Sequence, residues 1–216
     1  EMYKKKSLFI VFEGIEGCGK SYQSKKLYNS LKRIGLSTVL TREPGGTKSA
    51  EKIRELILQD YFNKTTQDKF HKYTDTLLYL AARNEHIQNK IKKLILKKNI
   101  IICDRFIDST FAYQVYGKGI SKKFVDFIHK KILENIKPDI TFLLKVTINK
   151  ALKRIEKRKK KNRYDKFPKN FYIKAQKSFI KIAKKNKKTH IILDSSLDDK
   201  KLEKEILKIV LNKIKK

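Results

Sequence analysis

A glycine-rich run with one lysine, close to the start of the chain, has the spacing of a phosphate-binding loop. Residues 14–21 read GIEGCGKS and fit the pattern G-x-x-x-x-G-K-[ST] without a mismatch. Glycines let successive backbone N–H groups point at phosphate oxygens, and a helix that starts at the loop adds partial positive charge. The pattern predicts that Lys20 reaches the β- and γ-phosphates of a nucleotide and that the Ser21 hydroxyl binds Mg²⁺. The residues expected at this nucleotide are Gly14, Ile15, Glu16, Gly17, Cys18, Gly19, Lys20, Ser21 and Tyr22.

A second acidic position follows an apolar strand pattern. Residues 100–104 read IIICD, and Arg105 comes next. At the carboxyl end of a parallel strand the carboxylate of Asp104 would lie near the phosphate loop, because ligands in such sheets bind at that edge. We therefore expect Asp104 to hold Mg²⁺ through water. The alternative is an aspartate that ends the strand beside an ordinary ion pair.

Short apolar strands alternate with helical patterns along the chain. The expected strands are Leu8–Phe12, Ser37–Thr41, Ile100–Cys103, Ile140–Val146 and His190–Leu193. The expected helices are Ser21–Ile34, Ala50–Leu58, Tyr73–Leu96, Phe124–Ile136, Lys150–Arg158, Phe171–Ala183 and Lys201–Ile214. Such alternation is typical of an α/β fold, in which helices cover both faces of a parallel sheet. The strands are too few for an eight-stranded barrel.

The composition is strongly basic. Among 216 residues there are 54 Lys and Arg against 22 Asp and Glu, which gives a net charge of +32. Such a balance suggests nucleic acid or an anionic membrane as a partner. However, only eight of the basic residues are Arg, and the lysines are spread along the chain without a single block that would mark a nucleic-acid track. We therefore interpret the charge as compositional and expect no specific nucleic-acid partner.

The cysteines and histidines form no metal-binding or disulfide pattern. Cys18 and Cys103 lack ligand spacing, and the four histidines are scattered. No segment approaches about 18 continuous apolar residues, and the basic start leads into a strand pattern rather than a signal peptide. We expect no membrane span and a reducing, cytoplasmic location.

Four further segments carry a resemblance to a known family. They are TREPGGT at 41–47, LLYLAAR at 77–83, DRFIDSTFAYQ at 104–114 and the pair Pro138-Asp139 before the fourth strand. With the phosphate loop, they make the chain resemble a bacterial-type thymidylate kinase over nearly its full length. The resemblance implies the P-loop nucleoside monophosphate kinase fold: one domain over residues 1–216, a five-stranded parallel sheet flanked by helices on both faces, and a small lid. It also implies transfer of the γ-phosphoryl group of ATP to dTMP in dTTP biosynthesis, with Mg²⁺ as cofactor, by a homodimer.

The same resemblance implies how the acceptor is recognised. Tyr79 would stack on the thymine ring, but stacking is indifferent to the base, so base identity must come from hydrogen bonds. Arg83 would face thymine O4, and Thr110 and Gln114 would meet the N3 and O2 edge. Tyr113 would lie at the sugar and disfavour a 2′-hydroxyl. The other implied contacts are Glu16 near the sugar 3′-hydroxyl and the magnesium shell, Arg54 and Arg105 at the acceptor phosphate, Pro44 against the nucleotide, and Glu43 near the magnesium ion or the acceptor phosphate.

The segment 157–169 is polar, basic and proline-containing, and we expect it to be an exposed, mobile loop. Its residues RKKKNRYD resemble the lid of the family. Members with a plain phosphate loop supply a catalytic positive charge from the lid, whereas others carry an Arg inside the loop, where this chain has Gly17. The resemblance therefore implies Arg163 as the catalytic cation, with Arg158 or Lys159 as the second choice. The expected catalytic residues are Lys20, Arg163, Arg105, Glu16 and Arg158.

One position departs from the family pattern, which often has an Asp after the Pro138-Asp139 strand where this chain has Lys145. Two other functions stay open from the sequence. The first is another pyrimidine nucleoside monophosphate kinase with a broader choice of acceptor. The second is a basic P-loop protein without kinase activity, which would bind DNA or RNA with a steep salt dependence.

Overall fold

The computed structural model describes residues 7–58, 70–196 and 199–215. In this part of the chain five strands form one sheet with only parallel pairings, in the order β2-β3-β1-β4-β5. The strands are β1 (Leu8–Glu13), β2 (Thr38–Arg42), β3 (Ile100–Asp104), β4 (Ile140–Lys145) and β5 (His190–Asp194). The predicted five-stranded parallel sheet is confirmed, with strand ends that differ by one residue.

The central strand β1 is apolar on both faces because helices cover both. Its residues alternate between the faces, so Phe9 packs edge to face on Phe106, with ring centroids 5.0 Å apart, while Phe12 packs on Phe142. All six residues of β1 are buried. A strand covered in this way reads as a continuous apolar run. Because β1 and β3 are adjacent and parallel, their carboxyl ends bring the phosphate loop and Asp104 to the same edge of the sheet.

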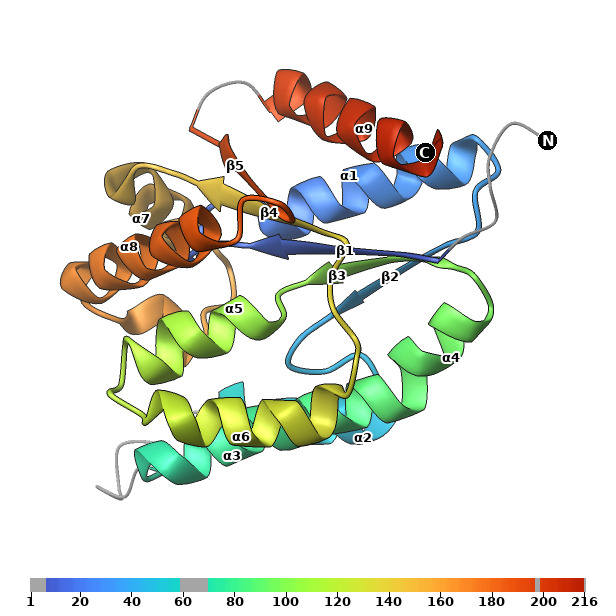
Figure 1. The fold of residues 1–216 in the computed structure, drawn as a ribbon. Coiled ribbons are helices and arrows are strands. Elements are labelled where there is room, and N and C mark those ends of the chain that lie inside the picture. Colours follow the sequence, from blue (N-terminus) through green and yellow to red (C-terminus); the bar gives the residue numbers. More distant parts are fainter. Residues whose placement is uncertain (1–6, 59–69, 197–198, 216) are drawn as a thin grey trace.

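Helices lie on both sides of the sheet (Figure 1). One side carries α1 (Lys20–Arg33) and α9 (Asp199–Lys215), and the other carries α2 (Lys48–Leu58), α3 (Lys72–His86), α4 (Lys92–Leu96), α5 (Ile107–Thr110) and α6 (Lys122–Leu133). The last two helices are α7 (Ile148–Glu156), which follows β4, and α8 (Lys169–Lys185), which packs against β4 and β5. Each predicted helix is confirmed in position. Among the described residues, no helix has the length and apolar character that crossing a bilayer requires.

Three short helical elements and one interruption were not predicted. The expected helix Tyr73–Leu96 contains a π-helical turn, η1 (Ile87–Ile91), between α3 and α4. The short elements are α5, the π turn η2 (Phe111–Val115) and the 3-10 helix η3 (Arg163–Lys166). Each has only four or five residues, which is too few to show the apolar periodicity of a helix.

Within the segment 157–169, the predicted exposed loop was wrong at Tyr164 and Asp165. Residues 157–161 are exposed, but Tyr164 and Asp165 are buried and belong to η3. Local hydrogen bonds explain the difference, because the Asn162 side chain accepts from the Tyr164 N–H while the Asp165 side chain accepts from the Asn162 N–H. The Tyr164 ring then packs edge to face on Phe167, with centroids 5.1 Å apart.

Candidate active site

The phosphate loop connects β1 to α1 and needs glycine at three positions. Gly14, Gly17 and Gly19 all have a positive φ, which L residues rarely adopt. Gly17 is also closed in by its surroundings, because a Cβ there would lie 2.4 Å from the backbone oxygen of Ala151 in α7. The loop therefore has no room for an arginine at residue 17 while α7 stays in place.

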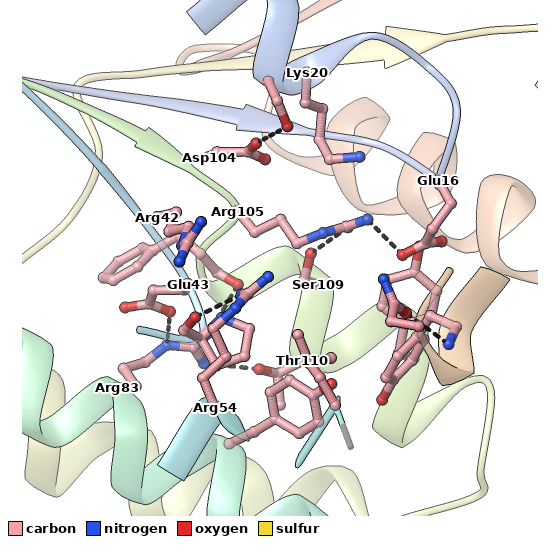
Figure 2. A pocket seen from close by; sticks show the side chains of 18 of the residues that line it. Glu16, Lys20, Arg42, Glu43, Arg54, Arg83, Asp104, Arg105, Ser109 and Thr110 are labelled. Atoms are coloured by element: carbon pink, nitrogen blue, oxygen red, sulfur yellow. Dashed lines mark hydrogen bonds and ion pairs between the residues drawn. The ribbon is translucent and has the colours of Figure 1, made fainter. Parts of the chain in front are cut away.

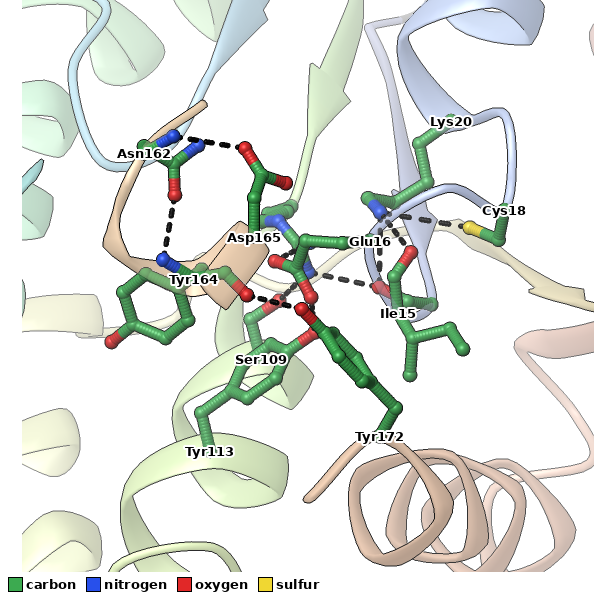
Figure 3. Close-up of polar contacts among 12 residues, drawn as sticks. Ile15, Glu16, Cys18, Lys20, Ser109, Tyr113, Asn162, Tyr164, Asp165 and Tyr172 are labelled. Carbon is green, nitrogen blue, oxygen red and sulfur yellow. Dashed lines mark hydrogen bonds and ion pairs between the residues drawn. The ribbon is translucent and has the colours of Figure 1, made fainter. Parts of the chain in front are cut away.

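Lys20 lies inside the loop that it belongs to. Its ammonium group donates to the backbone oxygens of Gly14, at 3.0 Å, and Ile15, at 2.8 Å (Figure 3). The side chain is buried, with three donors on a flexible stem. This geometry holds the positive charge at the concave side of the loop, where phosphate oxygens would replace the two carbonyl partners.

Ser21 and Asp104 face each other across the carboxyl edge of the sheet. The Ser21 hydroxyl donates to the Asp104 carboxylate at 2.5 Å. The described residues contain no group of three or more His, Cys, Asp or Glu that could hold a metal by themselves. One hydroxyl and one carboxylate are nevertheless a suitable donor set for Mg²⁺, which usually takes one or two protein oxygens and completes its shell with water and phosphate. The residues present thus fit the predicted ion.

Arg105 connects the phosphate loop to the neighbouring cavity. Its guanidinium donates to the Gly14 carbonyl at 2.9 Å. It also donates to the Ser109 hydroxyl at 3.0 Å and to the Glu16 carboxylate at 2.7 Å (Figure 2). Its backbone has φ 74°, a left-handed conformation that is unusual for an arginine. Such strained positions are concentrated at functional sites.

Glu16 accepts hydrogen bonds from two sides. Arg105 donates to one oxygen, and the Tyr113 hydroxyl donates to the other at 2.7 Å. Burial raises the pKa of Tyr113 well above its ordinary value, so the phenol remains a neutral donor. The pair fixes the Tyr113 ring at one wall of the cavity.

All nine residues that the sequence predicts for the acceptor line one cavity of about 190 Å³, beside the phosphate loop. They are Glu43, Pro44, Arg54, Tyr79, Arg83, Arg105, Thr110, Tyr113 and Gln114. Lys20, Ser21, Glu16, Asp104 and Arg158 line the same cavity. Six basic residues (Lys20, Arg42, Arg54, Arg83, Arg105 and Arg158) face three acidic ones (Glu16, Glu43 and Asp104). The cavity is therefore suited to a polyanion that has one flat, apolar part.

Arg83 is the most fully bonded side chain in the cavity wall. It donates to Glu43 at 2.7 Å, to Thr110 at 2.7 Å, to the Phe106 carbonyl at 2.8 Å and to His129 Nε2 at 2.7 Å. These contacts use four of the five N–H groups of a guanidinium. The planar fork is thus locked in one orientation, which a lysine could not reproduce.

Glu43 lies between Arg83 and His86 and also lines the cavity. One carboxylate oxygen accepts from Arg83, and the other lies 3.0 Å from His86 Nδ1. Burial raises the pKa of Glu43, but Arg83 and His86 lower it more, so the group is an anion. The other ring nitrogen of His86 lies 2.8 Å from the Thr41 hydroxyl. Both Glu43 oxygens are therefore committed to positioning other side chains.

Two histidines and one glutamate of this site were missed in the sequence. His86 and His129 seemed scattered because their partners are about 40 residues away. Glu13, the last residue of β1, accepts from the Phe106 N–H at 2.8 Å and from the Ser109 hydroxyl at 2.7 Å. Burial and the nearby Asp108 raise the pKa of Glu13 to about 7. A signal was present only for Glu13, because an acid that ends a fully apolar strand needs a buried partner.

His129 should make stability depend on pH. Arg83 can only donate to Nε2, so the imidazole is neutral, and burial together with Arg83 lowers its pKa to about 2. The unfolded chain binds a proton here below about pH 6.5, whereas the folded chain does not, so acid favours unfolding. Below that pH we expect the free energy of unfolding to fall by about 1.4 kcal/mol per pH unit more in the natural chain than in His129→Gln. Urea unfolding at a series of pH values measures this difference, and parallel profiles would contradict it.

The lid places Arg158, not Arg163, at the cavity. Arg158 lines the cavity and donates to Asp165 at 2.5 Å. Arg163 does not line it and instead forms an ion pair with Asp75 in the first turn of α3. Lys159 is exposed to solvent. The structure thus separates the two arginines that the sequence considered for one role, and of the two only Arg158 lines the cavity.

Other predicted residues lie at the edge of the site or behind it. Tyr22 is exposed on α1 and donates to Glu203 of α9 at 2.8 Å, so it does not line the cavity. Arg54 does line it and donates to the Pro44 carbonyl at 2.7 Å. Ile15 and Cys18 belong to the phosphate loop itself, and their side chains are buried. Of these four residues, only Arg54 points a charge into the cavity.

Comparisons with known proteins agree on one family. The family model described as thymidylate kinase matches residues 12–206. The thymidylate kinase of Sulfurihydrogenibium sp. (strain YO3AOP1) is 38% identical over 207 residues, which cover 96% of each chain. That of Wolbachia pipientis wMel is 42% identical over 178 residues, or 82% of this chain and 85% of the other. The crystal structure of thymidylate kinase from Ehrlichia chaffeensis is similar with a TM-score of 0.75 and 33% sequence identity, over 95% of this chain and 99% of that chain.

Proposed function

The chain belongs to the thymidylate kinase family and transfers the γ-phosphoryl group of ATP to dTMP, and from this premise we propose which residues carry out the transfer. One observation carries the proposal: the phosphate loop and the Tyr79–Arg83 wall open into the same cavity. A donor phosphate in the loop and an acceptor nucleotide against that wall would therefore meet between Lys20 and Arg105. Such alignment is most of what phosphoryl transfer requires.

On the donor side, the loop N–H groups and Lys20 hold the β- and γ-phosphates of ATP. Ser21 would hold Mg²⁺ directly and Asp104 through water. When bound, the ion offsets negative charge on the β- and γ-phosphates. Lys20 exchanges its two carbonyl partners for phosphate oxygens, which places its charge where negative charge develops in the transition state.

On the acceptor side, Tyr79 stacks on thymine and Arg83 identifies it. The fifth N–H of Arg83 is the one left for thymine O4, and Thr110 and Gln114 complete the base edge. Tyr113, fixed by Glu16, lies at the sugar. Arg54 and Arg105 hold the acceptor phosphate. Glu43 acts through Arg83, because both its oxygens are already bonded.

For the transfer itself we assign the lid charge to Arg158. The dTMP phosphate is ionised near neutral pH and attacks without a general base, so the site needs cations rather than a proton acceptor. Arg158 is the lid arginine that lines the cavity. Its partner Asp165 has a buried carboxylate, which keeps the guanidinium on the cavity side of the lid. We place the reaction in the cytoplasm, where both substrates are held.

The experiment that tests this function is coupled detection of ADP with five acceptors, dTMP, dUMP, dCMP, dGMP and dAMP, in the presence of ATP and Mg²⁺. We expect dTMP to give the highest kcat/KM and ADP release without an acceptor to be slow. Failure to convert dTMP, together with ready phosphorylation of another acceptor, would overturn the assignment of Arg83 to thymine.

We also propose that the enzyme is a homodimer through the helices α2, α3 and α6. Leu56, Leu77 and Phe127 are exposed on these three helices, which pack side by side. Large apolar side chains on adjacent elements are typical of a protein interface. We expect sedimentation to give a dimer that Phe127→Glu converts to monomer. Leu96→Glu, at an exposed leucine of α4, is the matched control that should leave the dimer intact.

A further inference from the structure

Arg163 joins the lid to the helix that carries the base-recognition residues. Its guanidinium forms an ion pair with one carboxylate oxygen of Asp75, and Lys118 donates to the other oxygen at 2.6 Å. The Asp75 side chain is 2% exposed and that of Arg163 is 20% exposed, so the carboxylate half of the ion pair is buried. Asp75, Tyr79 and Arg83 are spaced four residues apart on α3 and therefore share one face of the helix. The lid thus holds the face of α3 that recognises thymine.

Tyr164, the next residue, lies against the base pocket. Its ring meets Tyr79 and Tyr113 edge to face, with centroid distances of 6.2 Å and 5.6 Å. Its hydroxyl is 3.4 Å from Gln114 Nε2, which donates to it. Tyr164 therefore touches both the stacking residue and an edge-reading residue, and it also lines the cavity. The guanidinium of Arg163 lies over the Tyr164 ring at 5.2 Å from its centroid.

The same short helix also fixes the phosphate side of the lid. Asp165 follows Tyr164, and one of its carboxylate oxygens accepts from Arg158. The other oxygen accepts from the Asn162 N–H (Figure 3). Tyr172 of α8 donates to the Tyr164 carbonyl, which ties η3 to the body of the protein. Because η3 has only four residues, a movement of Arg163 moves Tyr164 and Asp165 with it. The position of Tyr164 at the cavity and the position of Arg158 therefore depend on the same short helix.

We propose that Arg163 is a positioning residue rather than a catalytic one: its ion pair with Asp75 latches η3 over the acceptor base and thereby sets Arg158 at the phosphates. The inference rests on the proposed function of the cavity. It assigns Arg163 and Asp75 to closing the thymine site, and it makes delivery of the lid charge depend on the same contact.

The test compares the natural chain with Arg163→Gln, Asp75→Asn and the double variant. A latch predicts that each single change raises the KM for dTMP about tenfold and lowers kcat by no more than about threefold, because saturating dTMP can still hold η3, and with it Arg158, in the closed position. The double variant should resemble Asp75→Asn, because that change already breaks the Arg163 contact and also removes the ion pair of Asp75 with Lys118. Lys160→Met, which removes one exposed lid charge, is the matched control and should leave KM and kcat unchanged.

A second measurement reads the latch without any catalysis. The lid contains five consecutive basic residues at 157–161, all exposed, so trypsin can cut there when the lid opens. We expect mass spectrometry to show several-fold faster cleavage within this run in Arg163→Gln and Asp75→Asn than in the natural chain. Equal cleavage rates in all variants would overturn the latch. So would a loss of about 10³-fold in kcat with an unchanged KM for dTMP in Arg163→Gln, because that result would place Arg163 at the phosphates. If the natural chain did not phosphorylate dTMP, the proposed function would be wrong. The cleavage rates would still show whether the Arg163–Asp75 contact keeps the lid closed.

Discussion

Arg158→Met is expected to lower kcat by about 10³-fold, or about 4 kcal/mol, while the KM values for ATP and dTMP change little. The physical reason is that the lid guanidinium faces charge that grows in the transition state, so its contribution is absent from ground-state binding. Arg158 lines the cavity, and methionine keeps much of the stem but removes the charge. Steady-state and single-turnover kinetics with dTMP measure the loss.

A matched variant distinguishes this role from general lid charge. Lys160→Met removes one positive charge two residues away at an exposed position, and it should retain nearly all activity. Arg158→Lys should recover only part of the rate, because an ammonium group cannot bind Asp165 and a phosphate as a planar fork. Near-normal kcat in Arg158→Met would defeat the assignment.

Arg83→Met is expected to destabilise the fold by about 3–5 kcal/mol and to abolish the preference for thymine. The loss of stability follows because Arg83 and Glu43 form a buried ion pair, in which each side chain is 3% exposed. Removing the cation leaves a buried anion with only His86 beside it. Denaturant unfolding gives the stability change, and the acceptor panel gives the selectivity.

Two comparisons make the result specific. Adding Glu43→Gln to Arg83→Met removes the stranded charge, so the double variant should recover part of the lost stability. Arg42→Met breaks an ion pair with Glu51 in which the arginine is 54% exposed, and it should cost no more than about 1 kcal/mol. Equal losses in Arg83→Met and Arg42→Met would show that burial of the pair is not what matters.

The elements with long apolar patterns could be predicted from the sequence because their signals are local. The run IIICD in β3, for example, marks both a buried strand and the acid at its end. The phosphate loop is equally local, since its function depends on eight consecutive residues. The residues predicted to bind the acceptor had no such local signal. Thr110 and Gln114, for example, became candidates only through the resemblance to the family. In the structure all nine predicted acceptor residues line one cavity.

The supporting residues could not be predicted because their partners are distant in the chain. Asp75 and Arg163 are separated by 88 positions and His129 and Arg83 by 46, so no spacing rule connects them. For the same reason the sequence, which favoured Arg163 over Arg158, could not show where either arginine lies. Both are basic residues of one polar loop, and only the buried carboxylates of Asp165 and Asp75 direct them to different places.

The tight contact between Gly17 and the backbone of α7 has an evolutionary consequence. A family in which some members keep their catalytic arginine in the phosphate loop and others in the lid suggests an easy exchange between the two. In this chain a side chain at residue 17 would collide with a carbonyl oxygen that no rotamer change can move. An arginine at residue 17 would first require α7 to shift. Moving the catalytic arginine from the lid to the phosphate loop therefore needs a rearrangement of the main chain, and a single substitution is not enough.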